Sequence, residues 1–128
     1  SSVTTATNTV RVYSAAGVLG VNATSASPLP TLGAVGASGC IERPDGTIVV
    51  AYSGATDTVR AYDANLTTVL WDFSDSIRLS TPGRVAVRPN GNVLVTDTVL
   101  NHIVEISSSG TFVRVLDDGT LATPGYLQ

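Results

Sequence analysis

The chain has 128 residues, of which 43% are hydrophobic and 13% are charged, and its net charge is −3. This length suits one ordinary domain, and the balance of hydrophobic over charged residues excludes an intrinsically disordered chain. A mildly acidic chain without a basic cluster is not expected to bind nucleic acid or anionic lipid. No apolar run approaches the ~20 residues that a membrane-spanning helix needs, so membrane insertion is not expected either.

Valine and threonine are abundant, and no segment has the periodicity of a helix, so the sequence predicts an all-β fold. Three short strands are expected first, at residues 2–6, 9–14 and 17–21, followed by a connecting loop over the Ser-, Pro- and Gly-rich residues 22–37. Two groups of four strands follow, at residues 38–43, 47–53, 58–63 and 67–72, and then at 83–88, 92–97, 102–107 and 111–116.

Short motifs recur along the chain at a nearly constant spacing. The turn motif Pro-Asp-Gly at residues 44–46 returns as Pro-Asn-Gly at 89–91, and Thr-Pro-Gly at 81–83 returns at 123–125. Glycine accepts the positive φ that such turns need, and asparagine tolerates it. Four short strands in units of about 42–50 residues are typical of β-propeller blades. The sequence therefore predicts four-stranded antiparallel blades at residues 38–80 and 81–122.

The second of these units resembles a known repeat family. Residues 81–116, TPGRVAVRPNGNVLVTDTVLNHIVEISSSGTFVRVL, resemble an NHL repeat, in which Pro-x-Gly-Val-Ala-Val-Asp precedes a glycine turn, Ile-Tyr-Val-Ala-Asp and Asn-His-x-Ile. Residues 47–70, TIVVAYSGATDTVRAYDANLTTVL, also look like the related YVTN-type repeats. Many NHL repeats have aspartate where Arg88 stands, and residues 101–102 (Asn-His) lie one position late. The resemblance implies a β-propeller and covers most of residues 38–128.

The two ends of the chain complement each other in this scheme. Residues 123–128 match the beginning of a first strand, whereas residues 1–21 match the second to fourth strands, so together they would form one seam blade. The chain then holds about three blades' worth of strands, fewer than the 4–8 blades of typical propellers. We therefore expect a protein partner, which is either a second copy that completes a six-bladed homodimer or further blades of a longer parent chain.

Arg43, Arg84 and Arg88 belong to the first strand of each unit, which is the innermost strand of a propeller blade. If their side chains point into the central channel, they would form a positive ring suited to an anionic ligand. If they pair with neighbouring carboxylates, their role is structural. Both interpretations stand, and these arginines are the candidate ligand-binding residues.

Carboxylates occur in pairs in the loops that follow the fourth strand of each unit. The pairs are Asp72 with Asp75 and Asp117 with Asp118. Ca²⁺ takes several such oxygen ligands, so a calcium site is one interpretation of these loops. An ordinary turn is the other, since Asp-Gly sequences form turns readily, and no other cofactor is expected.

Asp97 and the only histidine, His102, also have two interpretations. As an acid–base pair or as metal ligands they would carry chemistry. As structural residues, Asp97 would accept hydrogen bonds from loop N–H groups and His102 would begin the next strand. The single cysteine, Cys40, cannot form an intrachain disulfide and is expected to be a buried, unreactive thiol.

These features favour a non-catalytic propeller module that acts as a binding or structural scaffold, with its loops as contact sites. No nucleophile elbow, phosphate-binding loop or dinucleotide fingerprint occurs in the sequence. Trp71 and Phe73 are expected to fill gaps between blades. The lysine-free composition, rich in Ser and Thr, suggests an extracellular protein.

Two other functions stay open. Proteins with similar repeats include sugar-lactone hydrolases and an amidating lyase, which hold a metal near the propeller axis, so the resemblance also allows a metal-dependent enzyme of the lactonase or lyase type. Glu42 is the one clear candidate for such an inner-strand ligand. The other alternative is a structural subunit of a larger extracellular or virion assembly, which adds neighbours through exposed edge strands.

Overall fold

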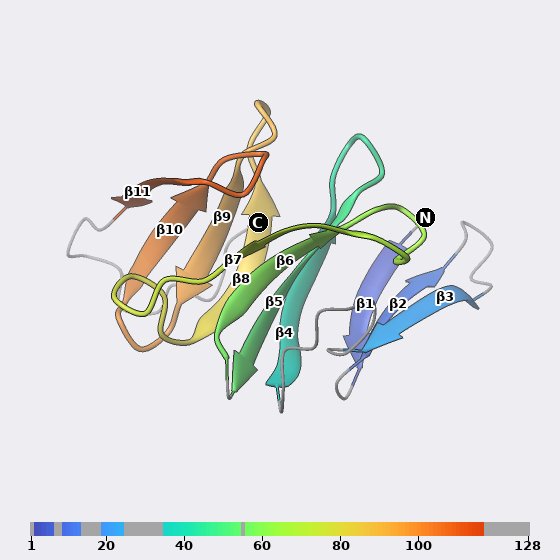
Figure 1. Cartoon of the computed structure of the whole chain (residues 1–128), viewed down its shortest axis with the longest axis horizontal. Helices are drawn as coiled ribbons and strands as arrows, with labels where there is room; N and C mark the ends of the chain where they lie inside the picture. The colour runs from blue at the N-terminus through green and yellow to red at the C-terminus, as the bar shows by residue number, and fades with distance from the viewer. Residues whose placement is uncertain (1, 7–8, 14–18, 25–34, 55, 117–128) are drawn as a thin grey trace.

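The computed structural model describes residues 2–6, 9–13, 19–24, 35–54 and 56–116, with side chains from Gly36 onward. These residues form eleven β-strands and no helix (Figure 1). The first strands are β1 (Ser2–Ala6), β2 (Thr9–Tyr13) and β3 (Leu19–Thr24). The next are β4 (Val35–Glu42), β5 (Ile48–Gly54), β6 (Thr58–Tyr62) and β7 (Val69–Phe73). The last are β8 (Pro82–Val87), β9 (Val93–Asp97), β10 (His102–Ile106) and β11 (Phe112–Leu116).

Each group of strands forms one antiparallel sheet in which neighbours in the sequence are hydrogen-bonded to each other. The first sheet has the order β1-β2-β3, the second has β4-β5-β6-β7, and the third has β8-β9-β10-β11. The three sheets stand side by side, with the second in the middle (Figure 1). The fold is all-β, with blade-like four-stranded antiparallel sheets, and the predicted fold class is confirmed.

The predicted connecting loop over residues 22–37 is wrong at both ends, because β3 continues to Thr24 and β4 begins at Val35. The small residues at the start of β4 suggested a loop. Their backbone nevertheless pairs with β5 from Val35 opposite Gly54 onward, with a bulge between Ala37 and Gly39. Residues 25–34 and the predicted strand at 123–128 lie outside the described residues.

The second and third sheets contact each other through their inner strands, β4 and β5 against β8. A Cβ atom on Gly39 would lie 2.5 Å from the carbonyl oxygen of Gly83, so a side chain does not fit there without a shift of the backbone. Ser38 Oγ donates a hydrogen bond of 2.7 Å to the carbonyl oxygen of Pro82 and so joins the two sheets. Farther out, the space is filled by larger side chains: Trp71, Phe73 and Phe112. Trp71 and Phe73 therefore fill the space between sheets, as predicted.

The second sheet is buried on both of its faces. Along β5, Val49 and Ala51 join the core shared with the third sheet, whereas Ile48, Val50 and Tyr52 join a second cluster on the opposite face. Because successive residues of a strand point to opposite faces, a strand between two other sheets must be apolar at every position. This explains the continuous apolar run of β5 within an otherwise alternating sequence.

Tight turns recur at one end of the sheets, where the PDG and PNG motifs lie. The glycines of these turns have positive φ, at 90° for Gly46, 89° for Gly91 and 91° for Gly110. Each glycine N–H closes its turn by donating to the carbonyl oxygen three residues earlier: Arg43, Arg88 and Ser107. An L side chain at such a φ is strained, so the conformation of the turns explains the glycines.

A pair of glycine substitutions separates this strain from packing between sheets. Gly46→Ala places its Cβ 3.7 Å from Ala64, in ordinary contact, and should lower the free energy of unfolding by about 1 kcal/mol through the φ strain. Gly110→Ala has the same strain and also brings its Cβ within 2.6 Å of the Trp71 ring. We expect a loss larger by about 1–3 kcal/mol for Gly110→Ala, measured by urea denaturation. Equal losses for the two variants would contradict the packing of Trp71 on this turn.

Candidate functional site

Asp97 ends β9, is fully buried, and anchors two loops. One carboxylate oxygen accepts the N–H groups of Ser80 and Thr81, and the other accepts those of Val99 and Leu100 at 3.0 and 2.9 Å. Burial opposes the ionisation of Asp97, but these four N–H groups outweigh it and hold the pKa of the carboxyl below its usual value. Asp97 therefore has a structural role.

His102 lies opposite Asp97 in the β9–β10 ladder, but its ring contacts a different group. The Nε2 atom is 2.7 Å from the carbonyl oxygen of Arg78, in the loop between β7 and β8. This hydrogen bond ties β10 to the same loop whose Ser80 and Thr81 N–H groups are held by Asp97. The two residues thus fix one loop from two sides, which favours the structural interpretation over an acid–base pair.

The three candidate ligand-binding arginines lie in three different environments. Arg84 is exposed on β8. Arg88 Nη1 lies 3.6 Å from Glu105 Oε1, which also accepts a hydrogen bond of 2.8 Å from Arg114 Nε. Arg43 is only 7% exposed and contacts neither of these groups. Arg88 thus pairs with a carboxylate, whereas Arg43 lines a cavity between two turns, and the predicted positive ring around a central channel stays a prediction.

Glu105 is the acceptor that organises the third sheet's charged cluster. Besides the arginines, Asn92 Nδ2 donates a hydrogen bond of 2.8 Å to its second oxygen. The hydrogen bond from the Asn92 side chain is the largest cause of the lowered pKa of Glu105. The hydrogen bond from Arg114 and the charges of Arg114 and Arg88 lower this pKa further. The carboxylate therefore stays ionised in a nearly closed site.

The predicted calcium ligands in the described part of the chain are held by protein groups. Asp72 receives two hydrogen bonds from Arg60, at 2.7 Å from Nε and 3.0 Å from Nη2. Asp75 accepts the N–H groups of Ile77 and Arg78 with one oxygen, at 3.0 Å each. Asp117 and Asp118 lie outside the described residues. Within residues 36–54 and 56–116, no three or more His, Cys, Asp or Glu side chains are placed to hold a metal ion.

A buried polar network near Arg60 escaped the sequence analysis. The hydroxyl groups of Tyr52 and Tyr62 are 2.8 Å apart, and the Arg60 guanidinium lies 5.9 Å from the Tyr62 ring centroid. Burial is the main cause of the raised pKa of Tyr52, and its hydrogen bond to Tyr62 adds to the effect. The available signal was an arginine between the apolar residues Val59 and Ala61 of β6. The network stabilises the second sheet on the side away from the third.

Cys40 lies on β4 and is partly buried. Burial raises the pKa of its thiol to about 11, so the nucleophilic thiolate is scarce at neutral pH. This agrees with the prediction of an unreactive thiol, although burial is incomplete.

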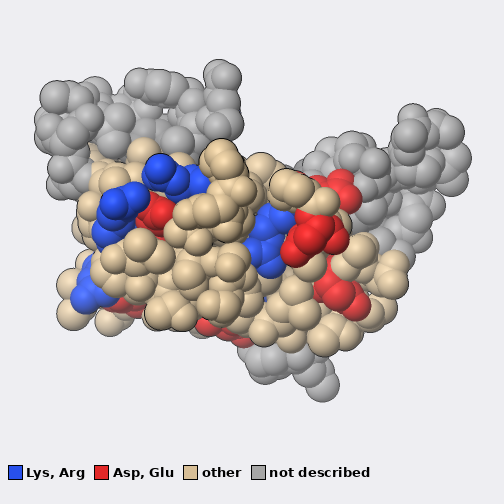
Figure 2. All heavy atoms as spheres, turned by 90° about the horizontal axis from the view of Figure 1, so that it is seen from above, with Lys and Arg blue, Asp and Glu red and all other residues tan. Residues whose placement is uncertain are grey.

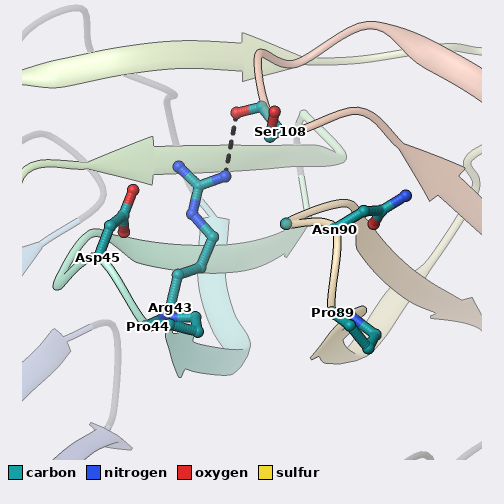
Figure 3. A pocket seen from close by; sticks show the side chains of 7 residues that line it. Arg43, Pro44, Asp45, Pro89, Asn90 and Ser108 are labelled. Carbon is teal, nitrogen blue, oxygen red and sulfur yellow. Dashed lines mark hydrogen bonds between the residues drawn. The ribbon is translucent and has the colours of Figure 1, made fainter.

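A pocket lined by unlike polar groups lies between the tight turns of the second and third sheets. A cavity of about 280 Å³, which we call the turn pocket, is lined by Arg43, Pro44, Asp45, Pro89, Asn90, Gly91 and Ser108. Figure 3 shows the Arg43 side chain between Asp45 on one side and Asn90 on the other, with its guanidinium directed at Ser108. The two turns that form the walls are the repeated PDG and PNG motifs.

Arg43 is fixed by contacts from both sheets. Its Nε donates to Thr47 Oγ1 at 2.7 Å, and its Nη1 donates to the Ser108 carbonyl oxygen at 3.0 Å. The same carbonyl oxygen accepts a bond of 3.0 Å from Trp71 Nε1, and the guanidinium lies 5.9 Å from the Trp71 ring centroid. Hydrogen bonds from Thr47 lower the pKa of Asp45, and the charge of Arg43 adds a smaller contribution. The sequence signalled the turns but not the contact between them.

No helix long and apolar enough to cross a bilayer occurs among the residues that the structure describes.

Comparison with known proteins identifies the fold but no family. No protein-family model matches the sequence, and no curated protein matches it. A crystal structure of a protein of unknown function from Bacteroides caccae is similar, with a TM-score of 0.62 and 17% sequence identity. The match covers 89% of this chain but 40% of that protein's chain. At this identity, the similarity shows the fold alone.

The lowered pKa of Asp97 predicts a pH dependence of stability. Because the unfolded-state pKa is about 3.9, the carboxylate contributes fully above that pH, and its contribution is lost as pH falls through the lower folded-state pKa. Asp97→Asn should cost about 1–3 kcal/mol at pH 7, and this difference from the parent should shrink below pH 4. Urea denaturation at several pH values measures both effects.

Asp57→Asn is the matched control for this experiment. Asp57 makes one exposed hydrogen bond, from the Gly54 N–H at 3.3 Å. Its substitution should change stability by no more than about 0.5 kcal/mol. A difference between Asp97→Asn and the parent that stays constant down to pH 2 would contradict the role assigned to the carboxylate.

Proposed function

We propose that the chain is a non-catalytic β-propeller module of the NHL/YVTN repeat type, which acts as a scaffold by stacking its sheets with further blades. The observation that carries this proposal is the likeness of the two junctions between sheets. At one junction β4 and β5 pack on β8, and at the other β1 and, to a smaller extent, β2 pack on β4. A packing relation that repeats from one unit to the next can be continued by added units.

We propose that β1 is the second strand of an incomplete blade, as the repeat spacing of the sequence suggests. Within the described residues β1 pairs with β2 alone, so the place on its other side is open to an added strand. An added strand there would complete a four-stranded blade by edge pairing. We propose that a second copy, or further blades of a longer chain, completes a ring of this kind.

The use of the charged side chains supports a scaffold over an enzyme. Asp97, Asp72 and Asp75 are engaged by backbone N–H groups or by arginine. Groups held in this way stabilise loops and strand pairs, whereas a catalytic carboxylate needs a free face toward its substrate. The turn pocket, discussed below, is a binding feature that fits within the same scaffold.

Light scattering behind a sizing column tests the proposal on the 128-residue chain. We expect a mass above that of one chain, and a stable dimer would identify the second copy as the source of the missing blades. A well-folded monomer at every concentration would overturn the need for added blades. Elemental analysis of the same sample tests the non-catalytic role, because one metal ion per ring that survives dialysis would contradict it.

A further inference from the structure

The buried charged side chains of the described residues do not all have partners of the same kind. They are Arg43, Arg60, Asp97 and Glu105. Arg60 pairs with Asp72, Glu105 pairs with two arginines, and Asp97 is surrounded by four N–H groups. Arg43 contacts a hydroxyl, a carbonyl oxygen and an indole ring, and no carboxylate of the described residues lies within 4.0 Å of it.

A buried guanidinium without a direct ion pair is costly, because neutral acceptors replace only part of its lost hydration. Asp45 acts on Arg43 through its charge but forms no ion pair with it. The hydrogen bonds of Arg43 use Nε and Nη1, which leaves Nη2 available to an added acceptor. The side chain lines the turn pocket, so this donor can be reached from the tight-turn end of the molecule. Seen from that end, Figure 2 shows a small basic surface near the middle, bordered by acidic surface and separate from the larger basic cluster at one side.

The other walls of the turn pocket define the kind of anion that fits. Asn90 uses its Oδ1 to accept the Asn92 N–H at 3.0 Å, and its amide nitrogen points away from Arg43 (Figure 3), so Asn90 forms a wall of the pocket. The rings of Pro44 and Pro89 provide apolar surface for carbon atoms. Asp45 places a negative charge on one side, which disfavours ligands with more than one negative charge.

We propose that the turn pocket binds a small organic monocarboxylate, whose carboxylate pairs with the Arg43 guanidinium and whose carbon portion lies between the two prolines. The cavity of about 280 Å³ suits a ligand of the size of an amino acid derivative. The free Nη2 group of Arg43 can donate a charge-assisted hydrogen bond to a carboxylate oxygen, and such bonds are stronger than those between neutral groups. The site lies between two described sheets and does not depend on added blades.

Trp71 is the only tryptophan of the chain and reports on this site directly. It contacts the Arg43 guanidinium and shares the Ser108 carbonyl oxygen with it, so a carboxylate at Arg43 should change its fluorescence. N-acetylalanine is the probe, and N-acetylalaninamide is its neutral control of equal size. At constant ionic strength, we expect saturable binding of the acid and binding of the amide weaker by about tenfold or more, since hydrogen bonds to charged groups contribute about 1.5–3 kcal/mol.

Two substitutions locate the site. Arg43→Gln should abolish the fluorescence response, whereas Arg84→Gln, which removes an exposed arginine outside the pocket, should leave it unchanged. Asp45→Asn should tighten binding of the acid about two- to fivefold, because an exposed like charge is removed. This second variant decides the matter if Arg43→Gln fails to fold.

Three results would overturn the proposal. The first is the absence of a saturable response to the acid up to about 50 mM, where even a weak site with a Kd near 1 mM would be filled. The second is an equal response to the acid and the amide. The third is an Asp45→Asn variant that binds the acid no more tightly than the parent does.

Discussion

The close approach of β4 and β8 is the constraint on which the rest of the described structure depends. Gly39 faces the backbone of Gly83 at a distance that excludes a side chain, and Ser38 joins the two strands by a hydrogen bond. The inner strands therefore carry small residues, while Trp71 and Phe112 fill the space between the outer strands. This gradient of side-chain size makes the gap between the sheets taper, as blades around an axis require.

The second and third sheets differ in the arrangement of their charged side chains. Arg60 lies opposite Asp72 between β6 and β7, and Glu105 lies opposite Arg114 between β10 and β11. The third and fourth strands of both sheets are thus joined by one ion pair, with the signs exchanged. Exchanged signs preserve the pairing within a sheet and change the charge that each sheet presents to its surroundings. The repeats are therefore alike in backbone and distinct in electrostatics.

The sequence predicted the strands of the second and third sheets because apolar alternation and turn glycines are local signals. It missed the start of β4, where Gly36 and its small neighbours indicate a loop locally but pair with β5. Arg43 and Arg88 occupy equivalent places beside the PDG and PNG turns, yet one reaches Ser108 of the next sheet and the other reaches Glu105 of its own. Which neighbour is present decides the role of such a residue, and a single repeat carries no information about its neighbour.

The turn pocket follows from the same stacking. Arg43, Pro44 and Asp45 come from the second sheet, whereas Pro89, Asn90 and Ser108 come from the third, so the pocket exists only while the sheets are stacked. A ligand that binds only the stacked form stabilises that form by mass action. Binding at the turn pocket and the stability of the contact between the two sheets are therefore linked. The Trp71 ring packs against the Gly110 turn of the third sheet and shares the Ser108 carbonyl oxygen with Arg43, so its environment should depend on both.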